Sequence, residues 1–186
     1  TTSEDFGLAP ASYDAAGVAS HVVSQLKLGA LVELDHPTSN NVSVNPDAVA
    51  AGTSLAGNPK ADDGFPGWAT SPSVYLAPGS SYSVTVALGG VTESANLCGW
   101  IDFNRNGTFD TGERTCASAP PANATSAKLT WTIPAGVSQG LTYARLRLSY
   151  DPVTFPTGKV GSGEVEDYSF TVVNSPTLAS APTADN

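Results

Sequence analysis

Residues 97–116 read LCGWIDFNRNGTFDTGERTC, and this stretch decides how the rest of the chain is interpreted. From Asp102 onward it follows the pattern D-x-N-x-N-G, five further residues and Glu, which is the spacing of a calcium-binding loop. Calcium binds six to eight oxygen atoms at about 2.3–2.6 Å, and Gly107 allows the tight turn that wraps alternate residues around one ion. The expected ligands are Asp102, Asn104, Asn106, Thr108 (through its backbone carbonyl), Asp110 and Glu113. The pattern therefore predicts a Ca2+ site.

The same residues also suit a simpler interpretation, an Asn/Gly/Asp-rich turn between two strands whose carboxylates face water. We favour calcium because the side-chain ligands, the glycine and the closing Glu all fall in register. Residues 97–103, which precede the loop, are apolar, aromatic and β-branched and predict a strand rather than a helix. We therefore expect an EF-like loop carried by a sheet, with a structural metal, and not a sensor that opens a helix pair.

Cys98 and Cys116 are the two cysteines of the chain, and they bracket the loop where its entering and leaving segments must approach each other. Two states are open: a disulfide, or two buried free thiols in a reducing compartment. We favour the disulfide because the composition points outside the cell. Closing a ring of this size would stabilise the fold by about 3 kcal/mol.

The composition limits the classes of function. The chain has 17 acidic and 8 basic residues, for a formal net charge of -9, and no cluster of Lys and Arg. Such a chain is poorly suited to bind nucleic acid and well suited to divalent cations. No apolar run approaches the length of a membrane span, so we expect no membrane insertion by this domain. Because the chain contains no Met, we interpret it as a mature region or a piece of a longer protein.

Short alternating segments separated by Gly and Pro turns predict an all-β fold, an antiparallel β-sandwich with long irregular loops. The longest irregular stretch is residues 35–67. One domain is expected over residues 1–173, followed by a Pro/Thr/Ser/Ala-rich linker over residues 174–186. The expected strands are residues 28–34, 74–76, 82–88, 97–103, 128–133, 142–150 and 165–173.

Alternation within residues 142–150 places Leu146 and Leu148 toward the core and Arg145 and Arg147 outward, where the arginines would pair with surplus acids. His21 stands apart from any cluster, and we expect it to be a hydrogen-bonded structural histidine.

Three carboxylates, Glu164, Glu166 and Asp167, lie within four residues at the start of the last expected strand. Because like charges repel, they must face solvent, pair with Arg145 and Arg147, or hold a cation. In a strand, residues 164 and 166 share one face and residue 167 lies on the other. Two arrangements stay open, an arginine network and a second metal site. The residues concerned are Asp62, Asp63, Glu164 and Asp167.

Several ordered segments resemble one known family. Residues 163–168 read GEVEDY, residues 99–104 read GWIDFN and residues 143–149 read YARLRLS. The segments DFGLAP at 5–10, His21 with LGA at 28–30, DDG at 62–64 and PTG at 156–158 also agree, with Leu8 where the family has Asp. Together they resemble the GEVED domain, which is named after the pentapeptide at 163–167. The cysteine pair is not part of that family pattern.

The resemblance implies a β-sandwich from a large secreted or cell-surface bacterial protein, often of adhesin type. The family is similar to the non-repetitive domain of CshA-type fibrillar adhesins. In long adhesins, comparable sandwiches act as scaffolds that project a ligand-binding domain. No enzymatic activity comes with the family.

We therefore expect a noncatalytic, calcium-stabilised extracellular scaffold or spacer, whose partners are other domains of the same long surface protein. The alternative is that the domain itself binds a glycan or a host protein in a calcium-dependent way, with Trp68, Tyr75 or Trp100 stacking on a sugar. A third hypothesis, a glycosidase with paired carboxylates, is disfavoured because the sequence lacks a Ser/His/Asp order and a His cluster.

Overall fold

The computed structural model describes residues 4–30, 63–68 and 71–175, and these residues form an all-β fold. Within them, helical geometry is confined to three 3-10 turns, η1 (Ala11–Asp14), η2 (Pro66–Trp68) and η3 (Thr111–Glu113). None of the described segments forms a helix with the length and apolar character that crossing a membrane requires. Asp62, the expected strand residues 31–34 and residues 176–186 of the expected linker lie outside the described residues.

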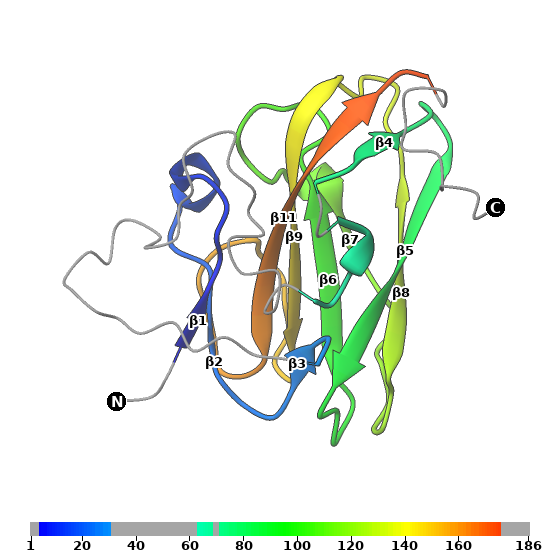
Figure 1. Ribbon diagram of the computed structural model, residues 1–186. Helices are drawn as coiled ribbons and strands as arrows, with labels where there is room; N and C mark the ends of the chain where they lie inside the picture. The colour runs from blue at the N-terminus through cyan, green and yellow to red at the C-terminus, as the bar shows by residue number, and fades with distance from the viewer. Residues whose placement is uncertain (1–3, 31–62, 69–70, 176–186) are drawn as a thin grey trace.

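A five-stranded sheet with the order β4-β11-β9-β6-β7 is the centre of the molecule (Figure 1). Its strands are β4 (Ser73–Tyr75), β11 (Glu164–Val173), β9 (Gly140–Ser149), β6 (Asn96–Ile101) and β7 (Arg114–Cys116). The pairs β11–β9, β6–β9 and β6–β7 are antiparallel, whereas β4 runs parallel to β11.

Two three-stranded sheets accompany it, with the orders β3-β5-β8 and β1-β2-β10. The first contains β3 (Lys27–Leu28), β5 (Ser81–Gly89) and β8 (Ser126–Thr132). The second contains β1 (Glu4–Phe6), β2 (Ser20–Val22) and β10 (Lys159–Val160), with β10 parallel to β2. The expected antiparallel pairing is found between the long strands, whereas β4 and β10 pair in parallel. Both are short edge strands that follow long connections, so nothing forces the reversal that a tight hairpin imposes.

The main core lies between the five-stranded sheet and the β3-β5-β8 sheet. Alternate residues of β5 and β8, including Val84, Val86 and Leu129, pack against Leu146 and Phe170 of the larger sheet. Trp68 of η2 is also buried there. Its ring stacks on Phe170 with ring centres 5.3 Å apart, and its indole N–H donates to the Tyr82 hydroxyl at 3.0 Å. The sandwich thus places one apolar layer between two facing sheets.

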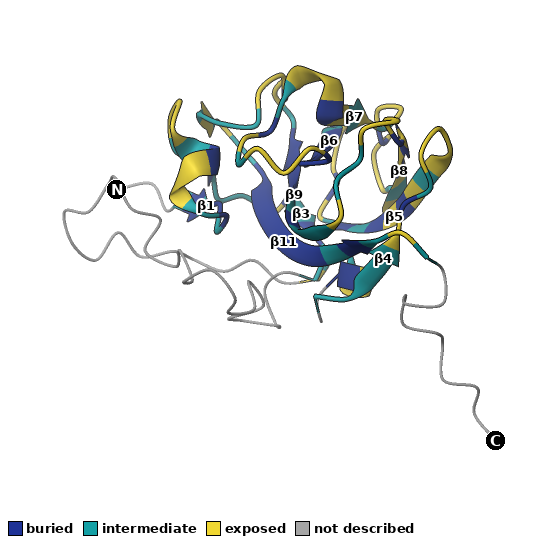
Figure 2. Cartoon of the chain, turned by 90° about the horizontal axis from the view of Figure 1, so that it is seen from above, coloured by how far each residue is buried: buried dark blue, intermediate teal, exposed yellow. Residues whose placement is uncertain are grey.

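The opposite face of the five-stranded sheet is also covered. Figure 1 shows β1 and β2 beside β11, on the side away from β5 and β8, and Figure 2 shows the same for β1. A second apolar cluster lies under this N-terminal segment and includes Ala9, Tyr13 and Trp100. Arg145 and Arg147 project to this face and are 0% and 1% exposed. Both arginines therefore lie on the face away from the main core, as expected, and Arg145 pairs with acids there. They are nevertheless buried, because the N-terminal segment covers that face of the sheet.

Six of the seven expected strands correspond to observed strands, with ends that differ by two residues or fewer. The seventh, residues 28–34, overlaps only the two-residue strand β3 within the part of the chain that the structure describes. The strands that sequence reasoning missed, β1, β2, β7 and β10, have two or three residues each, too few for an alternation to be recognised.

Strand β8 offers a direct test of the two-sheet core. We expect Leu129→Ala to lower the free energy of unfolding by about 2–5 kcal/mol, because Leu129 is buried between the sheets and its removal leaves a cavity. The neighbouring change Lys128→Ala should have an effect within about 0.5 kcal/mol, since Lys128 is exposed. Urea unfolding followed by fluorescence measures both values. Equal losses in the two variants would contradict the assigned faces of β8.

Candidate functional site

The loop between β6 and β7 brings the predicted calcium ligands together. Asp102 follows β6 directly and is fully buried. Its Oδ1 accepts from the Asn106 N–H at 3.2 Å and its Oδ2 from the Gly107 N–H at 3.0 Å. Asn104 Oδ1 also accepts from the Asn106 N–H, at 2.9 Å. Gly107 has φ +82°, a conformation that a residue without Cβ adopts at little cost. The first three side chains of the motif therefore converge on one turn.

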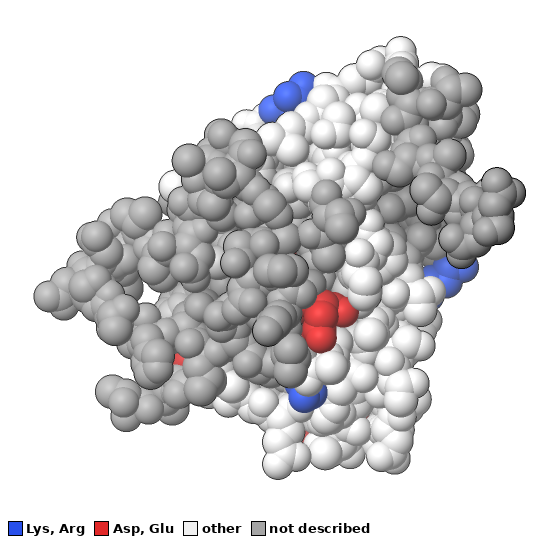
Figure 3. All heavy atoms as spheres, viewed as in Figure 1, with Lys and Arg blue, Asp and Glu red and all other residues white. Residues whose placement is uncertain are grey.

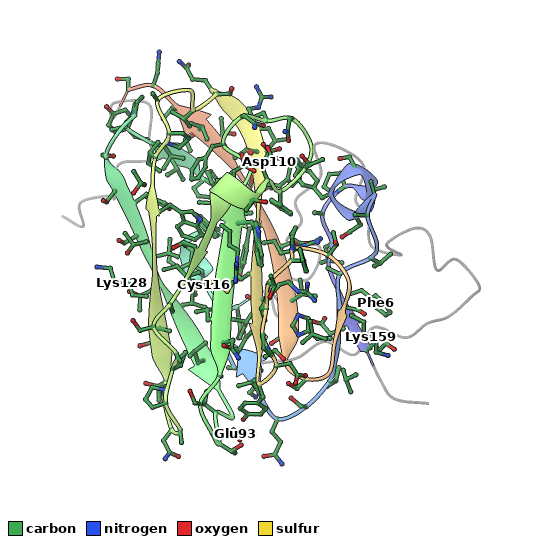
Figure 4. The ribbon with its side chains drawn as sticks, turned by 180° about the vertical axis from the view of Figure 1, so that it is seen from behind. Phe6, Glu93, Asp110, Cys116, Lys128 and Lys159 are labelled. Atoms are coloured by element: carbon green, nitrogen blue, oxygen red, sulfur yellow. A yellow bond between two sulfur atoms is a disulfide. The ribbon has the colours of Figure 1, made fainter. Side chains whose placement is uncertain are left out.

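The second half of the loop folds back onto the first. The Asn104 and Asn106 amides donate to Asp110 Oδ2 at 3.0 and 2.9 Å. The Thr108 hydroxyl donates to Asn106 Oδ1 at 2.8 Å and to Asp110 Oδ1 at 3.2 Å. Figure 4 shows Asp110 at the end of the molecule where this loop lies. Hydrogen bonds thus connect five oxygen-bearing residues of the loop in a continuous series.

Glu113 closes the loop from its stem. Its Oε1 accepts from the Phe103 N–H at 2.8 Å and from the Asn104 N–H at 3.4 Å, while its Oε2 accepts from the Asp110 N–H at 2.9 Å. The last contact forms a reciprocal capping arrangement with Asp110 at the start of η3. One carboxylate therefore ties the two ends of the loop together.

The loop concentrates negative charge. Burial raises the pKa of Glu113 to about 7, and the charge of Asp102 adds to the rise, while the N–H groups of Asp110 and Phe103 oppose it. Among the described residues, no ion pair reaches Asp102, Asp110 or Glu113. In the same part of the chain, no group of three or more His, Cys, Asp and Glu side chains is arranged to hold a metal. A cation here would therefore depend on amide and backbone oxygens as well as carboxylates.

Tyr13 joins the loop to the N-terminal segment. Its hydroxyl donates to Asp102 Oδ2 at 2.7 Å, and its ring packs against Phe109 and Tyr143 with ring centres 4.6 and 5.3 Å away. Burial, together with the Asp102 carboxylate, raises the pKa of Tyr13. Sequence reasoning missed this contact, because its partners are 89 residues apart and no local pattern connects them.

Cys98 and Cys116 form the predicted disulfide, with an S–S distance of 2.04 Å. They lie directly opposite each other on β6 and β7. Figure 4 shows Cys116 on β7, farther along the sheet from Asp110. The bridge therefore joins the two strands that carry the loop.

The glutamates of the signature, residues 163–167, hold distant segments against the sheet through hydrogen bonds. Glu164 Oε2 accepts from the Leu28 N–H at 2.7 Å. Glu166 Oε1 accepts from the Asp63 N–H at 2.9 Å, and both its oxygens lie 3.2 Å from the Gly64 N–H. The Tyr168 hydroxyl donates to Glu166 Oε2 at 2.7 Å. Both glutamates are buried, and each fixes a backbone segment far away in sequence.

Asp167 lies on the opposite face of β11 and pairs with Arg145. The guanidinium donates to both carboxylate oxygens at 2.8 Å, the two-bond geometry favoured for Arg and carboxylate. Asp14 accepts from the same guanidinium at 2.7 Å, and the Ala9 N–H donates to Asp167 at 2.7 Å. Burial alone disfavours the charged form of Arg145, but the Asp167 and Asp14 carboxylates outweigh it and raise the Arg145 pKa.

The second candidate site is thus divided between the two faces of the sheet. Asp167 belongs to the arginine pair, whereas Glu164 binds a backbone N–H on the other face. Asp63 accepts from the Ala30 N–H at 3.0 and 3.1 Å. The structure does not bring Glu164 and Asp167 to one place, and it describes nothing of Asp62.

Arg147 and His21 form a second buried polar group. The Arg147 Nε–H donates to His21 Nε2 at 2.9 Å, and His21 Nδ1–H donates to the Ser162 carbonyl at 2.7 Å. The other Arg147 nitrogens donate to backbone carbonyls, including those of Phe155 and Gly158. Burial and the nearby Arg147 charge lower the His21 pKa to about 3, so the ring is neutral at pH 7. His21 is therefore a hydrogen-bonded structural histidine, as expected.

Of the three aromatic residues considered for sugar stacking, Trp68 and Trp100 are 2% and 1% exposed. Their burial in the two apolar clusters was not predicted, because the sequence around a tryptophan does not show which face of a sheet other segments will cover. Tyr75 is 38% exposed. Of these three residues, only Tyr75 is exposed.

Residues 96–171 match the model of the GEVED domain, a span that runs from β6 to β11 and includes both the loop and the signature. This part of the chain is similar to the GEVED domain. A search of curated proteins found no match. Among solved structures, the chain is similar to a family 123 glycoside hydrolase from Clostridium perfringens that hydrolyses glycolipid glycans. That likeness has a TM-score of 0.33 and 13% identity, covers 56% of this chain and 23% of the hydrolase chain, and carries no information on activity.

The GEVED signature can be tested through its last residue. We expect Asp167→Asn to lower the free energy of unfolding by about 3–5 kcal/mol, because it removes the main countercharge of the buried Arg145. Glu93→Gln, a change of the same kind at an exposed position, should have an effect within about 0.5 kcal/mol. Denaturant unfolding compares the two variants. A loss below about 1 kcal/mol in Asp167→Asn would show that Asp14 alone satisfies Arg145.

The His21 environment predicts a pH dependence. Its pKa is about 3 in the folded protein and about 6.5 in the unfolded chain, so the unfolded state binds more protons between these values. Stability should fall as the pH decreases from 6.5 toward 3, by up to about 1.4 kcal/mol per pH unit from this group. Thermal melts of the wild-type protein and of His21→Gln across pH 7 to 4.5 test this. His21→Gln should melt lower at pH 7 but with a flatter slope, and an unchanged slope contradicts the assignment.

Proposed function

We propose that this GEVED-like domain is a noncatalytic, calcium-stabilised scaffold in a secreted or cell-surface bacterial protein of adhesin type. It would hold and present a ligand-binding region located elsewhere in the same protein. The observation that carries the proposal is the use of the signature carboxylates. All three are buried: Glu164 and Glu166 accept hydrogen bonds from backbone N–H groups, and Asp167 pairs with Arg145. These carboxylates therefore stabilise the fold.

Surface and covalent features agree with an extracellular scaffold. The disulfide belongs to oxidising compartments such as the outside of the cell. On the described surface in Figure 3, Lys, Arg, Asp and Glu side chains are few and scattered, so this face offers no basic patch for nucleic acid. The structure buries Trp68 and Trp100, two of the three aromatic residues considered for sugar stacking in the alternative, a glycan-binding module.

Calcium fits the β6–β7 loop by the chemistry of its donors. Every predicted ligand offers a hard oxygen atom, which is what calcium prefers. Two of the carboxylates, Asp102 and Glu113, are 0% and 6% exposed, and burying such charges without a countercharge is costly. A bound ion would supply positive charge beside them. Asp102, Asn104, Asn106, Asp110 and Glu113 would hold it through side chains and Thr108 through its backbone carbonyl.

The calcium proposal predicts a stability change in metal-free protein. At ten times the dissociation constant, calcium should raise the free energy of unfolding by about 1.4 kcal/mol, or about 3–6 °C in melting temperature. Three carboxylates place the dissociation constant at about 0.1–1 mM. Asp102→Asn and Asp110→Asn should abolish most of the response, whereas the exposed control Asp151→Asn should keep it.

Melting curves of chelated protein, with and without added calcium, measure this response, and magnesium serves as the ion control. If added calcium does not raise the melting temperature of the wild-type protein, the calcium part of the proposal is wrong. A response that all three variants retain would place the ion outside this loop. The scaffold role is tested separately with a glycan array, where specific binding by the domain alone would favour the glycan-binding alternative.

A further inference from the structure

The two sulfur atoms of the disulfide lie in different surroundings. Cys98 is in β6, which has neighbours on both sides, β9 and β7, and it is 3% exposed. Cys116 is in β7, the edge strand of the same sheet, and is exposed. A dissolved reagent therefore meets Cys116 from solvent, whereas the protein covers Cys98.

A fixed positive charge lies beside the covered sulfur. Arg114 Nη2 is 3.5 Å from Cys98 Sγ. The same nitrogen donates to the Val153 carbonyl at 2.7 Å, and the guanidinium lies over the Trp100 ring with its carbon 5.9 Å from the ring centre. These contacts hold the guanidinium in place. A neighbouring cation stabilises a cysteine thiolate, so it favours Cys98 as the sulfur that leaves when the bond breaks.

We propose that Cys116 is a site of S-thiolation by small thiols of the glutathione class. The thiolate of the small molecule attacks Cys116 Sγ and forms a new S–S bond to it. The bond between the two cysteines breaks, and its electron pair leaves on Cys98, whose thiolate faces Arg114. The products are a mixed disulfide at Cys116 and one free thiolate, so no outside oxidant is needed. A second small thiolate can then attack the mixed disulfide. This step frees the Cys116 thiolate and produces the disulfide of two small molecules.

The rest of the sheet does not depend on the bridge. Strand β7 pairs with β6 over three residues, and none of its own residues belongs to the main core. Opening the bridge should therefore change the β7 edge without unfolding the domain. The reaction is independent of calcium and of the scaffold role, so its test stands apart from theirs.

The experiment treats the folded protein with millimolar reduced glutathione and stops the reaction with an alkylating agent. Trypsin then cleaves after Arg105 and Arg114, which separates the two cysteines into different peptides. Mass spectrometry should find glutathione on Cys116 and the alkyl group on Cys98, with at least about a tenfold preference. Glutathione mainly on Cys98, equal labelling of both, or a bridge that stays intact for hours would each overturn the proposal.

Arg114 is tested by the rate of the first step. Arg114→Gln should slow bridge opening by about threefold to tenfold, while Arg114→Lys, which keeps a positive charge, should slow it less. Lys128→Gln, a charge change on β8, is the matched control and should leave the rate unchanged. An equal or faster rate in Arg114→Gln overturns the role of Arg114 as the positioning residue for the leaving sulfur. The labelling pattern of the wild-type protein remains decisive if a variant fails to fold.

Discussion

The buried pair of Arg145 and Asp167 is the interaction on which the rest of the structure depends. Arg145 is fully buried in the middle of the five-stranded sheet, where a guanidinium is stable only when carboxylates and carbonyls surround it. Asp167 comes from the neighbouring strand, Asp14 from η1, and the Pro156 carbonyl from the connection before β10. Three separate parts of the chain must therefore be in place before this charge is satisfied. The pair in this way specifies how the N-terminal segment sits on the sheet.

The signature and the β6–β7 loop use carboxylates in two different ways. In the signature, each buried acid has either a cation or backbone N–H groups from another segment. In the loop, the acids accept N–H groups from within the loop itself, and no described Lys or Arg forms an ion pair with them. The first arrangement holds distant segments together, whereas the second leaves negative charge in a short coiled segment. This contrast is the physical reason to look for a cation in the loop and not at the signature.

The sequence was informative wherever a residue's environment is determined by its neighbours in the chain. The alternation in residues 142–150 assigned Leu146 and Leu148 to the core, and the position of the two cysteines predicted their bridge. Alternation also separated Arg145 from the core face, but it cannot say what covers the other face. The covering segment around Asp5 and Tyr13 has no period, and its contacts reach residues 89 or more positions away. For the same reason, the sequence could list the loop ligands but could not show that Tyr13 reaches Asp102.

The long reach of the signature has a consequence for how the chain acquires its structure. Asp5 accepts from the Val165 N–H and Asp167 accepts from the Ala9 N–H, contacts that join residues 160 and 158 positions apart. Closing loops of this length before any contact is gained makes folding slow. A chain emerging from the ribosome lacks these anchors for its N-terminal segment until β11 has been made. The N-terminal segment should therefore stay undocked and the chain largely unfolded through most of its synthesis. The domain should fold as one unit once β11 has been synthesised.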